Sequence, residues 1–71
     1  MNIAVIGTGM VGQLVAVELA KKYQVLAIDK NNVFLKKIKR YNNKILTKEI
    51  NINNEDLIRE LENINLVVNC V

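Results

Sequence analysis

Runs of apolar residues alternate along this chain with segments of helical periodicity. Asn2–Ile6 is almost wholly apolar, and Gln24–Ile28 is a second such run that ends abruptly at Asp29. Short continuous apolar runs are typical of strands that are buried on both faces of a parallel sheet. A weaker run at Lys44–Leu46 and the segment Ile64–Val71 predict a third and a fourth strand. The residues between these last two runs begin with a polar stretch that we expect to be strand end and loop.

The first predicted helix follows the first strand and runs from Met10 to about Lys22. Small residues recur in it at every fourth position, which places them in one stripe on the helix surface. The stripe consists of Gly12, Ala16 and Ala20. A face with almost no side chain lets the helix axis lie close to the sheet, so this stripe is expected to face the strands.

Two further helices are predicted from capping residues and periodicity. The second takes its N-cap from Asn31 or Asn32 and ends at Tyr41. The third begins after Asn53 or Asn54, and acidic residues occupy its first turn, where the helix dipole favours negative charge. Its inward side is expected to consist of Leu57, Ile58 and Leu61.

A glycine motif joins the first strand to the first helix. Its sequence is Gly7-Thr8-Gly9-Met10-Val11-Gly12. The first glycine permits a tight turn, the second lets the backbone approach a pyrophosphate, and the third lets the helix pack closely on the strand. The N–H groups near Met10 and Val11 have no partner inside the helix and can bind the diphosphate. A Walker-type phosphate loop is excluded, because Gly12 is followed by Gln13 and Leu14 rather than by lysine and a hydroxyl residue.

An acidic residue completes this motif at the end of the second apolar run. Asp29 lies close to the separation of about 20 residues that the dinucleotide fingerprint requires. Its carboxylate can accept both ribose hydroxyls of the adenosine and would repel a 2′-phosphate, which favours NAD over NADP. The neighbouring Lys30 keeps NADP open as the alternative. We expect Asp29→Ala to weaken NAD binding and to leave the fold intact; the competing interpretation is that the glycines only shape a turn and Asp29 only ends a strand.

The order strand, helix, strand, helix, strand, helix, strand predicts an α/β fold with right-handed crossovers. By analogy with dinucleotide-binding folds, the parallel sheet of about four strands has the order 3-2-1-4 and flanking helices. Residues 1–71 are therefore expected to form the amino-terminal half of a Rossmann-type domain and to be a fragment of a longer chain. The free edge of the fourth strand makes a homo-oligomer possible.

Composition narrows the function classes. Ten Lys and Arg residues and seven Asp and Glu residues give a net charge of +3. The one dense basic cluster lies near the end of a predicted helix, where positive charge is favoured by the helix dipole. We therefore expect no nucleic-acid partner. Glycines and Glu18 interrupt the apolar start, so neither a signal sequence nor a membrane span is predicted, and a cytoplasmic protein is expected.

The chain has no histidine, and we predict neither catalytic nor metal-binding residues in it. Cys70 is the one cysteine and is expected to be a small apolar residue, although Asn69 and Cys70 could border the cofactor at the strand end.

With these residues in place, the sequence resembles the amino-terminal domain of the saccharopine dehydrogenase-like family. The resemblance is carried by the segments 3–12, 25–29 and 57–71. It implies an NAD(P)-binding domain of an oxidoreductase that acts on an amino-acid or related small substrate, with the substrate domain outside this chain. It also implies that Asn51-Ile52-Asn53 corresponds to a segment that reaches the adenine, with Asn51 in place of the usual acid.

A second hypothesis comes from another class of protein. The glycine turn and the acid that ends the second strand also resemble the non-catalytic nucleotide-sensing regulatory domains of potassium transport systems. Those domains usually have Gly-Asp after the third strand, and this chain has Lys48-Glu49 in that region. The sequence thus favours NAD(H) binding and leaves an oxidoreductase and a sensor as alternatives.

Overall fold

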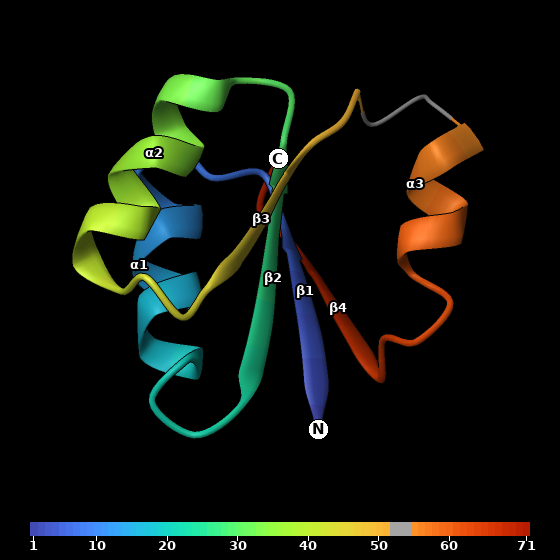
Figure 1. Cartoon of the computed structure of the whole chain (residues 1–71), viewed down its shortest axis with the longest axis horizontal. Coiled ribbons are helices and arrows are strands. Elements are labelled where there is room, and N and C mark those ends of the chain that lie inside the picture. Colours follow the sequence, from blue (N-terminus) through green and yellow to red (C-terminus); the bar gives the residue numbers. More distant parts are fainter. Residues whose placement is uncertain (52–54) are drawn as a thin grey trace.

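A computed structural model describes residues 1–51 and 55–71 of the chain. Its centre is one parallel sheet (Figure 1), in which the strands follow the order β3-β2-β1-β4. The strands are β1 (Asn2–Ile6), β2 (Gln24–Asp29), β3 (Leu46–Glu49) and β4 (Leu66–Asn69). This architecture confirms the predicted Rossmann-type α/β class and its 3-2-1-4 order.

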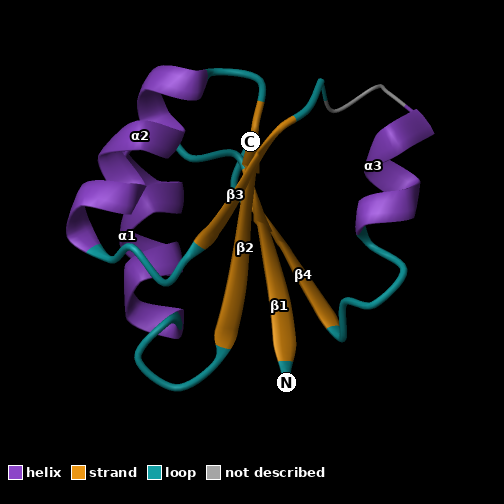
Figure 2. Ribbon diagram, in the orientation of Figure 1, coloured by secondary structure: helices purple, strands orange, loops and turns teal. Residues whose placement is uncertain are grey.

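The helices cover the two faces of the sheet unequally. They are α1 (Met10–Leu19), α2 (Asn32–Tyr41) and α3 (Glu55–Glu60). Figure 2 shows α1 and α2 together on one face and α3 on the other. This arrangement follows from right-handed crossovers, because the chain moves one way across the sheet through α1 and α2 and the opposite way through α3.

Each face of the sheet has its own apolar core. On the side of α1 and α2, strand residues such as Val5 and Ala27 pack with Leu35 and Ile38 of α2. On the side of α3, the second cluster consists of Ala4, Ile6, Ile28, Ile50 and Leu57. An isoleucine that is fully buried, as Ile38 is, contributes about 1.5–3 kcal/mol to stability. Burial on both faces explains why β1 and β2 have continuous apolar sequences rather than alternating ones.

Several element boundaries differ from the predictions. The third strand lies two to three residues later than expected, because Leu46 pairs with Leu26 and the strand continues through polar residues to Glu49. Helix α1 ends at Leu19 instead of near Lys22, and a turn in which Tyr23 N–H donates to Leu19 O follows it.

The inward face of α3 is narrower than predicted. Leu57 is buried and Leu61 packs partly against the same cluster, but Ile58 is 70% exposed. An ion pair between Lys48 of β3 and Glu60, 3.4 Å apart, also joins this helix to the sheet. The prediction that Ile58 faces inward is therefore wrong. Leu57 and Leu61, which directly follows the helix, are spaced by four residues and lie on the side of the strands, and Ile58, one position after Leu57, lies off that side. The proposed N-caps of α3, Asn53 and Asn54, lie outside the described residues.

Candidate functional site

The carboxyl ends of all four strands meet at one edge of the sheet. Beyond the strands, the ladder continues through three backbone hydrogen bonds: Gly7 N–H donates to Ile28 O at 2.8 Å, Cys70 N–H to Ile6 O at 2.7 Å, and Ile50 N–H to Asp29 O at 3.0 Å. These bonds fix the residues that follow each strand relative to one another. Ligands of open α/β sheets bind at this edge, so it is the candidate site.

The glycine turn leaves β1 at this edge and leads directly into α1, as predicted. Gly7 has a φ of +89°, which side chains rarely adopt, and a Cβ there would lie 3.0 Å from the carbonyl carbon of Cys70. A Cβ at Gly12 would overlap the carbonyl oxygen of Gly7 and lie 2.8 Å from its carbonyl carbon. Two of the three glycines are therefore required by the protein's own packing.

Gly9 differs from the other two glycines. A Cβ built there would meet no atom within 4 Å, so the fold itself does not require glycine at this position. Gly9 is the N-cap of α1, and no side chain caps the helix. Met10 and Val11 in the first turn are 82% and 65% exposed. An uncapped helix start beside open space favours an anionic ligand, because its N–H groups and the positive dipole end both attract negative charge.

Asp29 ends β2 and reaches across to the glycine turn. Its Oδ2 accepts a hydrogen bond from Thr8 N–H at 2.6 Å and another from the Thr8 hydroxyl at 2.9 Å. Its Oδ1 accepts one from Asn31 N–H at 2.8 Å. With 9% of its surface exposed, the carboxylate is a buried group that connects the turn, the end of β2 and the start of α2.

The environment keeps this carboxylate charged. Burial acts to raise the pKa of Asp29, but hydrogen bonds from the Thr8, Asn31 and Lys30 backbones and from the Thr8 hydroxyl outweigh burial and hold the pKa below its ordinary value of 3.8. Asp29 is therefore ionised at neutral pH. A fixed negative charge at the end of β2 is the feature that repels a 2′-phosphate in dinucleotide sites.

Sequence analysis missed the inward role of Thr8 and Gln13. Thr8 is completely buried, and both of its donors point to Asp29 rather than to solvent. Gln13, in the first helix, donates from Nε2 to Thr8 O at 2.9 Å. The backbone of Thr8 is thus held on both sides. The position of Thr8 directly after the first glycine was the one sequence feature that pointed to this contact, but its partner Asp29 lies 21 positions away in the sequence.

The remaining predicted site residues lie around the same edge. Lys30 and Asn51 are exposed directly after β2 and after the end of β3, and Ile52 lies outside the described residues. Asn69 Oδ1 accepts a hydrogen bond from Val71 N–H at 3.1 Å. Cys70 packs against the core beside the two packing glycines. All predicted site residues that the structure describes therefore lie at or near the carboxyl ends of the strands.

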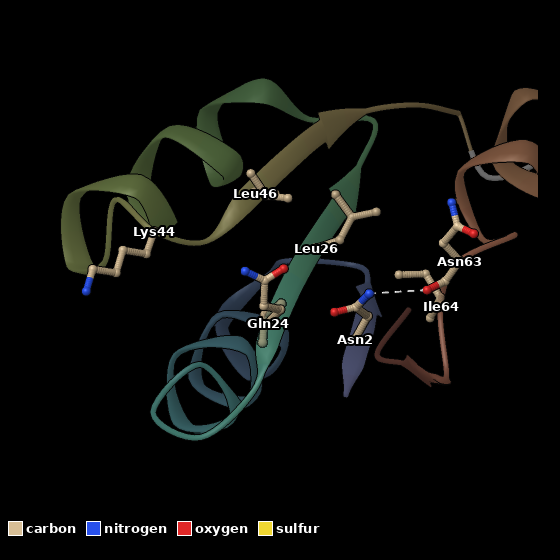
Figure 3. A pocket seen from close by; sticks show the side chains of 8 residues that line it. Asn2, Gln24, Leu26, Lys44, Leu46, Asn63 and Ile64 are labelled. Carbon is tan, nitrogen blue, oxygen red and sulfur yellow. Dashed lines mark hydrogen bonds between the residues drawn. The ribbon is translucent and has the colours of Figure 1, made fainter.

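A separate cavity lies at the opposite edge of the sheet (Figure 3), where the strands begin. It has a volume of about 190 Å³ and lies between the first residues of the strands and the chain after α3, where Asn2 Nδ2 donates to Asn63 O at 3.4 Å. None of the predicted site residues lines it. Within residues 1–51 and 55–71, no helix is long and apolar enough to cross a membrane, and no three acidic or cysteine side chains are grouped as metal ligands.

Comparison with known families gives a match over most of the chain. Residues 3–69 match the family model of the TrkA-N domain, a dinucleotide-binding, Rossmann-like domain that occurs in potassium transport regulators and in dehydrogenases. No curated protein matches the chain. The family match supports the predicted amino-terminal NAD(P)-binding Rossmann domain, but it does not support the assignment to the saccharopine dehydrogenase-like family.

Proposed function

We propose, because the chain belongs to the TrkA-N domain family, that it binds the ADP moiety of NAD(H) on the turn from Gly7 to Gly12 and that the nucleotide acts there as a regulatory ligand. The open space at Gly9 is the observation that carries this proposal. Gly7 and Gly12 are explained by internal packing, whereas Gly9 is explained by a ligand that needs the backbone bare. The diphosphate would lie against the N–H groups of Met10 and Val11.

The charge at the end of β2 supports NAD(H) over NADP(H). Asp29 is ionised at neutral pH, and a 2′-phosphate placed beside it would meet a fixed negative charge. Lys30 is the neighbouring cation and is exposed, so it can turn toward solvent instead of neutralising Asp29. We therefore expect NAD and NADH to bind more tightly than NADPH.

Calorimetric titration of the chain with NAD, NADH and NADPH tests the proposal. Gly9→Ala is the matched variant: its φ of −65° suits alanine, and the added methyl meets no protein atom, but it occupies the approach of the diphosphate. We expect the variant to stay folded and to bind NAD at least about tenfold more weakly, which corresponds to about 1.4 kcal/mol. Tighter binding of NADPH than of NADH, or equal NAD binding by the variant, would contradict the proposal.

An oxidoreductase cofactor domain is the second candidate, because TrkA-N domains also occur in dehydrogenases. In this version the saccharopine dehydrogenase-like resemblance applies, and a substrate domain outside this chain supplies the hydride-transfer residues. An enzyme assay of the full-length protein distinguishes the two candidates. A sensor binds NAD and forms no NADH with amino-acid substrates, whereas substrate-dependent NADH formation would support the oxidoreductase.

A further inference from the structure

Large apolar side chains are exposed along a groove between α1 and α2. Met10, Leu14 and Tyr41 are 82%, 66% and 72% exposed. The groove has a volume of about 760 Å³ between the two helices, where Met10 and Tyr41 line it together with Phe34, and Leu14 extends it along α1. Single exposed apolar residues are common, but a contiguous group with a polar rim marks an interaction surface.

The charged residues that line this α1–α2 groove are both cations. Lys37 and Arg40 lie one helical turn apart on α2, and neither has an ion-pair partner within residues 1–51 and 55–71. Helix α2 has four cations and no acid in its sequence. Glu18, the one acid of α1, is paired with Lys21 at 3.0 Å. A fitting occupant of the groove therefore combines an apolar side chain with negative charge.

The outer side of α3 has this combination of side chains. Ile58 is 70% exposed, and Glu55 and Glu62 lie three positions before it and four positions after it, on the same side of the helix. The turn continues past the end of α3 to Glu62, whose N–H donates to Arg59 O at 3.3 Å. Both glutamates are exposed, and neither forms an ion pair in the part of the chain that the structure describes. We call these three residues the α3 stripe.

We propose that the α1–α2 groove of one chain receives the α3 stripe of a second copy. Ile58 packs among the apolar side chains of the groove, and the two glutamates of the stripe lie beside Lys37 and Arg40. The groove and α3 are on opposite faces of the sheet (Figure 2), so a chain cannot make this contact with itself. Because the contact joins two unlike surfaces, association is head-to-tail. The inference does not rest on the proposed nucleotide site.

Sedimentation equilibrium of the chain in about 0.1 M and about 1 M sodium chloride tests the association, because the Debye length falls from about 10 Å to about 3 Å between them. We expect the average mass to rise with protein concentration at low salt and to rise much less at high salt. Ile58→Ser should weaken the association about tenfold or more, since its burial in the groove is lost. Val33→Ser is the matched control, because Val33 is 60% exposed and lies outside both surfaces, and it should change nothing.

Exchanging charges between the two surfaces tests how they pair. Lys37→Glu and Glu62→Lys should each weaken the association about fivefold or more, because each places like charges across the contact. A chain with both substitutions has opposite charges there again and should recover most of the wild-type association. An equimolar mixture of the two single variants should likewise associate more tightly than either variant alone.

Three results would overturn the inference. The first is a wild-type chain that stays monomeric up to about 1 mM. The second is association that neither salt nor the two charge reversals change, which would indicate pairing through the free edge of β4. The third is a doubly substituted chain that associates as poorly as the single variants. If circular dichroism shows that one variant does not fold, the salt dependence and the remaining variants decide.

Discussion

Replacing Gly12 by alanine is expected to destabilise the fold, whereas the same change at Gly9 is nearly neutral. Gly12 lies in the first turn of α1, against the residues where β1 ends. The added Cβ would overlap the carbonyl oxygen of Gly7 and lie 2.8 Å from its carbonyl carbon. Both atoms belong to the backbone, so no side chain can rotate away and relieve the overlap.

The magnitudes separate the two variants clearly. Alanine is about 1 kcal/mol better than glycine inside a helix, which alone would make Gly12→Ala stabilising. Overpacking of a rigid site costs about 1–3 kcal/mol and sometimes more. Because the overlap involves backbone on both sides, we take an overpacking cost above this range, about 3–5 kcal/mol, and after subtracting the gain of about 1 kcal/mol from helix propensity we place the net loss for Gly12→Ala at about 2–4 kcal/mol. At Gly9, the loss of a favoured N-cap residue costs about 1 kcal/mol or less.

Urea unfolding followed by circular dichroism measures both changes. A domain of 71 residues has an expected stability of about 4–10 kcal/mol, so a loss of 2–4 kcal/mol is a large part of the total. A Gly12→Ala variant within about 1 kcal/mol of the wild type would mean that α1 does not lie against the turn as described. A Gly9→Ala variant as unstable as Gly12→Ala would refute the open space at Gly9.

Two further predictions concern the start of α2 and the charge beside it. The pKa of Asp29 is lower in the folded chain than the unfolded value of 3.8, so the ionised carboxylate stabilises the fold above pH 3.8. This contribution is lost as the pH falls through the folded pKa. Urea unfolding of wild type and Asp29→Asn should therefore show a difference in unfolding free energy that shrinks below pH 3.8. Asn31→Ala should cost about 1 kcal/mol by thermal unfolding, because the Asn31 side chain accepts the Val33 N–H at 2.9 Å as the N-cap, and a change below a few tenths would refute that capping role.

The strand order and the glycine turn could be predicted because their determinants are local or follow from general rules of topology. Val5 and Ala27 belong to strands buried on both faces, and such strands have continuous apolar sequences. The crossover rule then fixes the sheet order. The spacing of the glycines after the first strand predicted the turn. The structure adds that close packing requires glycine at Gly7 and Gly12 but not at Gly9.

The boundaries of weaker elements could not be predicted, because pairing and packing decide them. Lys48 and Glu49 are polar and exposed, yet they belong to β3 because their backbones pair with β2 at its edge. Ile58 has an apolar side chain but lies beside the buried row of α3 rather than in it. Neither case has a signal in the local sequence.

The contact between Thr8 and Asp29 changes what a mutation of the acid can reveal. The sequence suggested that Asp29→Ala would remove a ribose contact and leave the fold intact. In the structure, that change also takes the acceptor from two donors of Thr8, which is completely buried. An unsatisfied buried donor costs about 1–3 kcal/mol, so the variant loses stability as well as a ligand contact. Weaker binding by Asp29→Ala therefore cannot be assigned to the loss of the ribose contact alone.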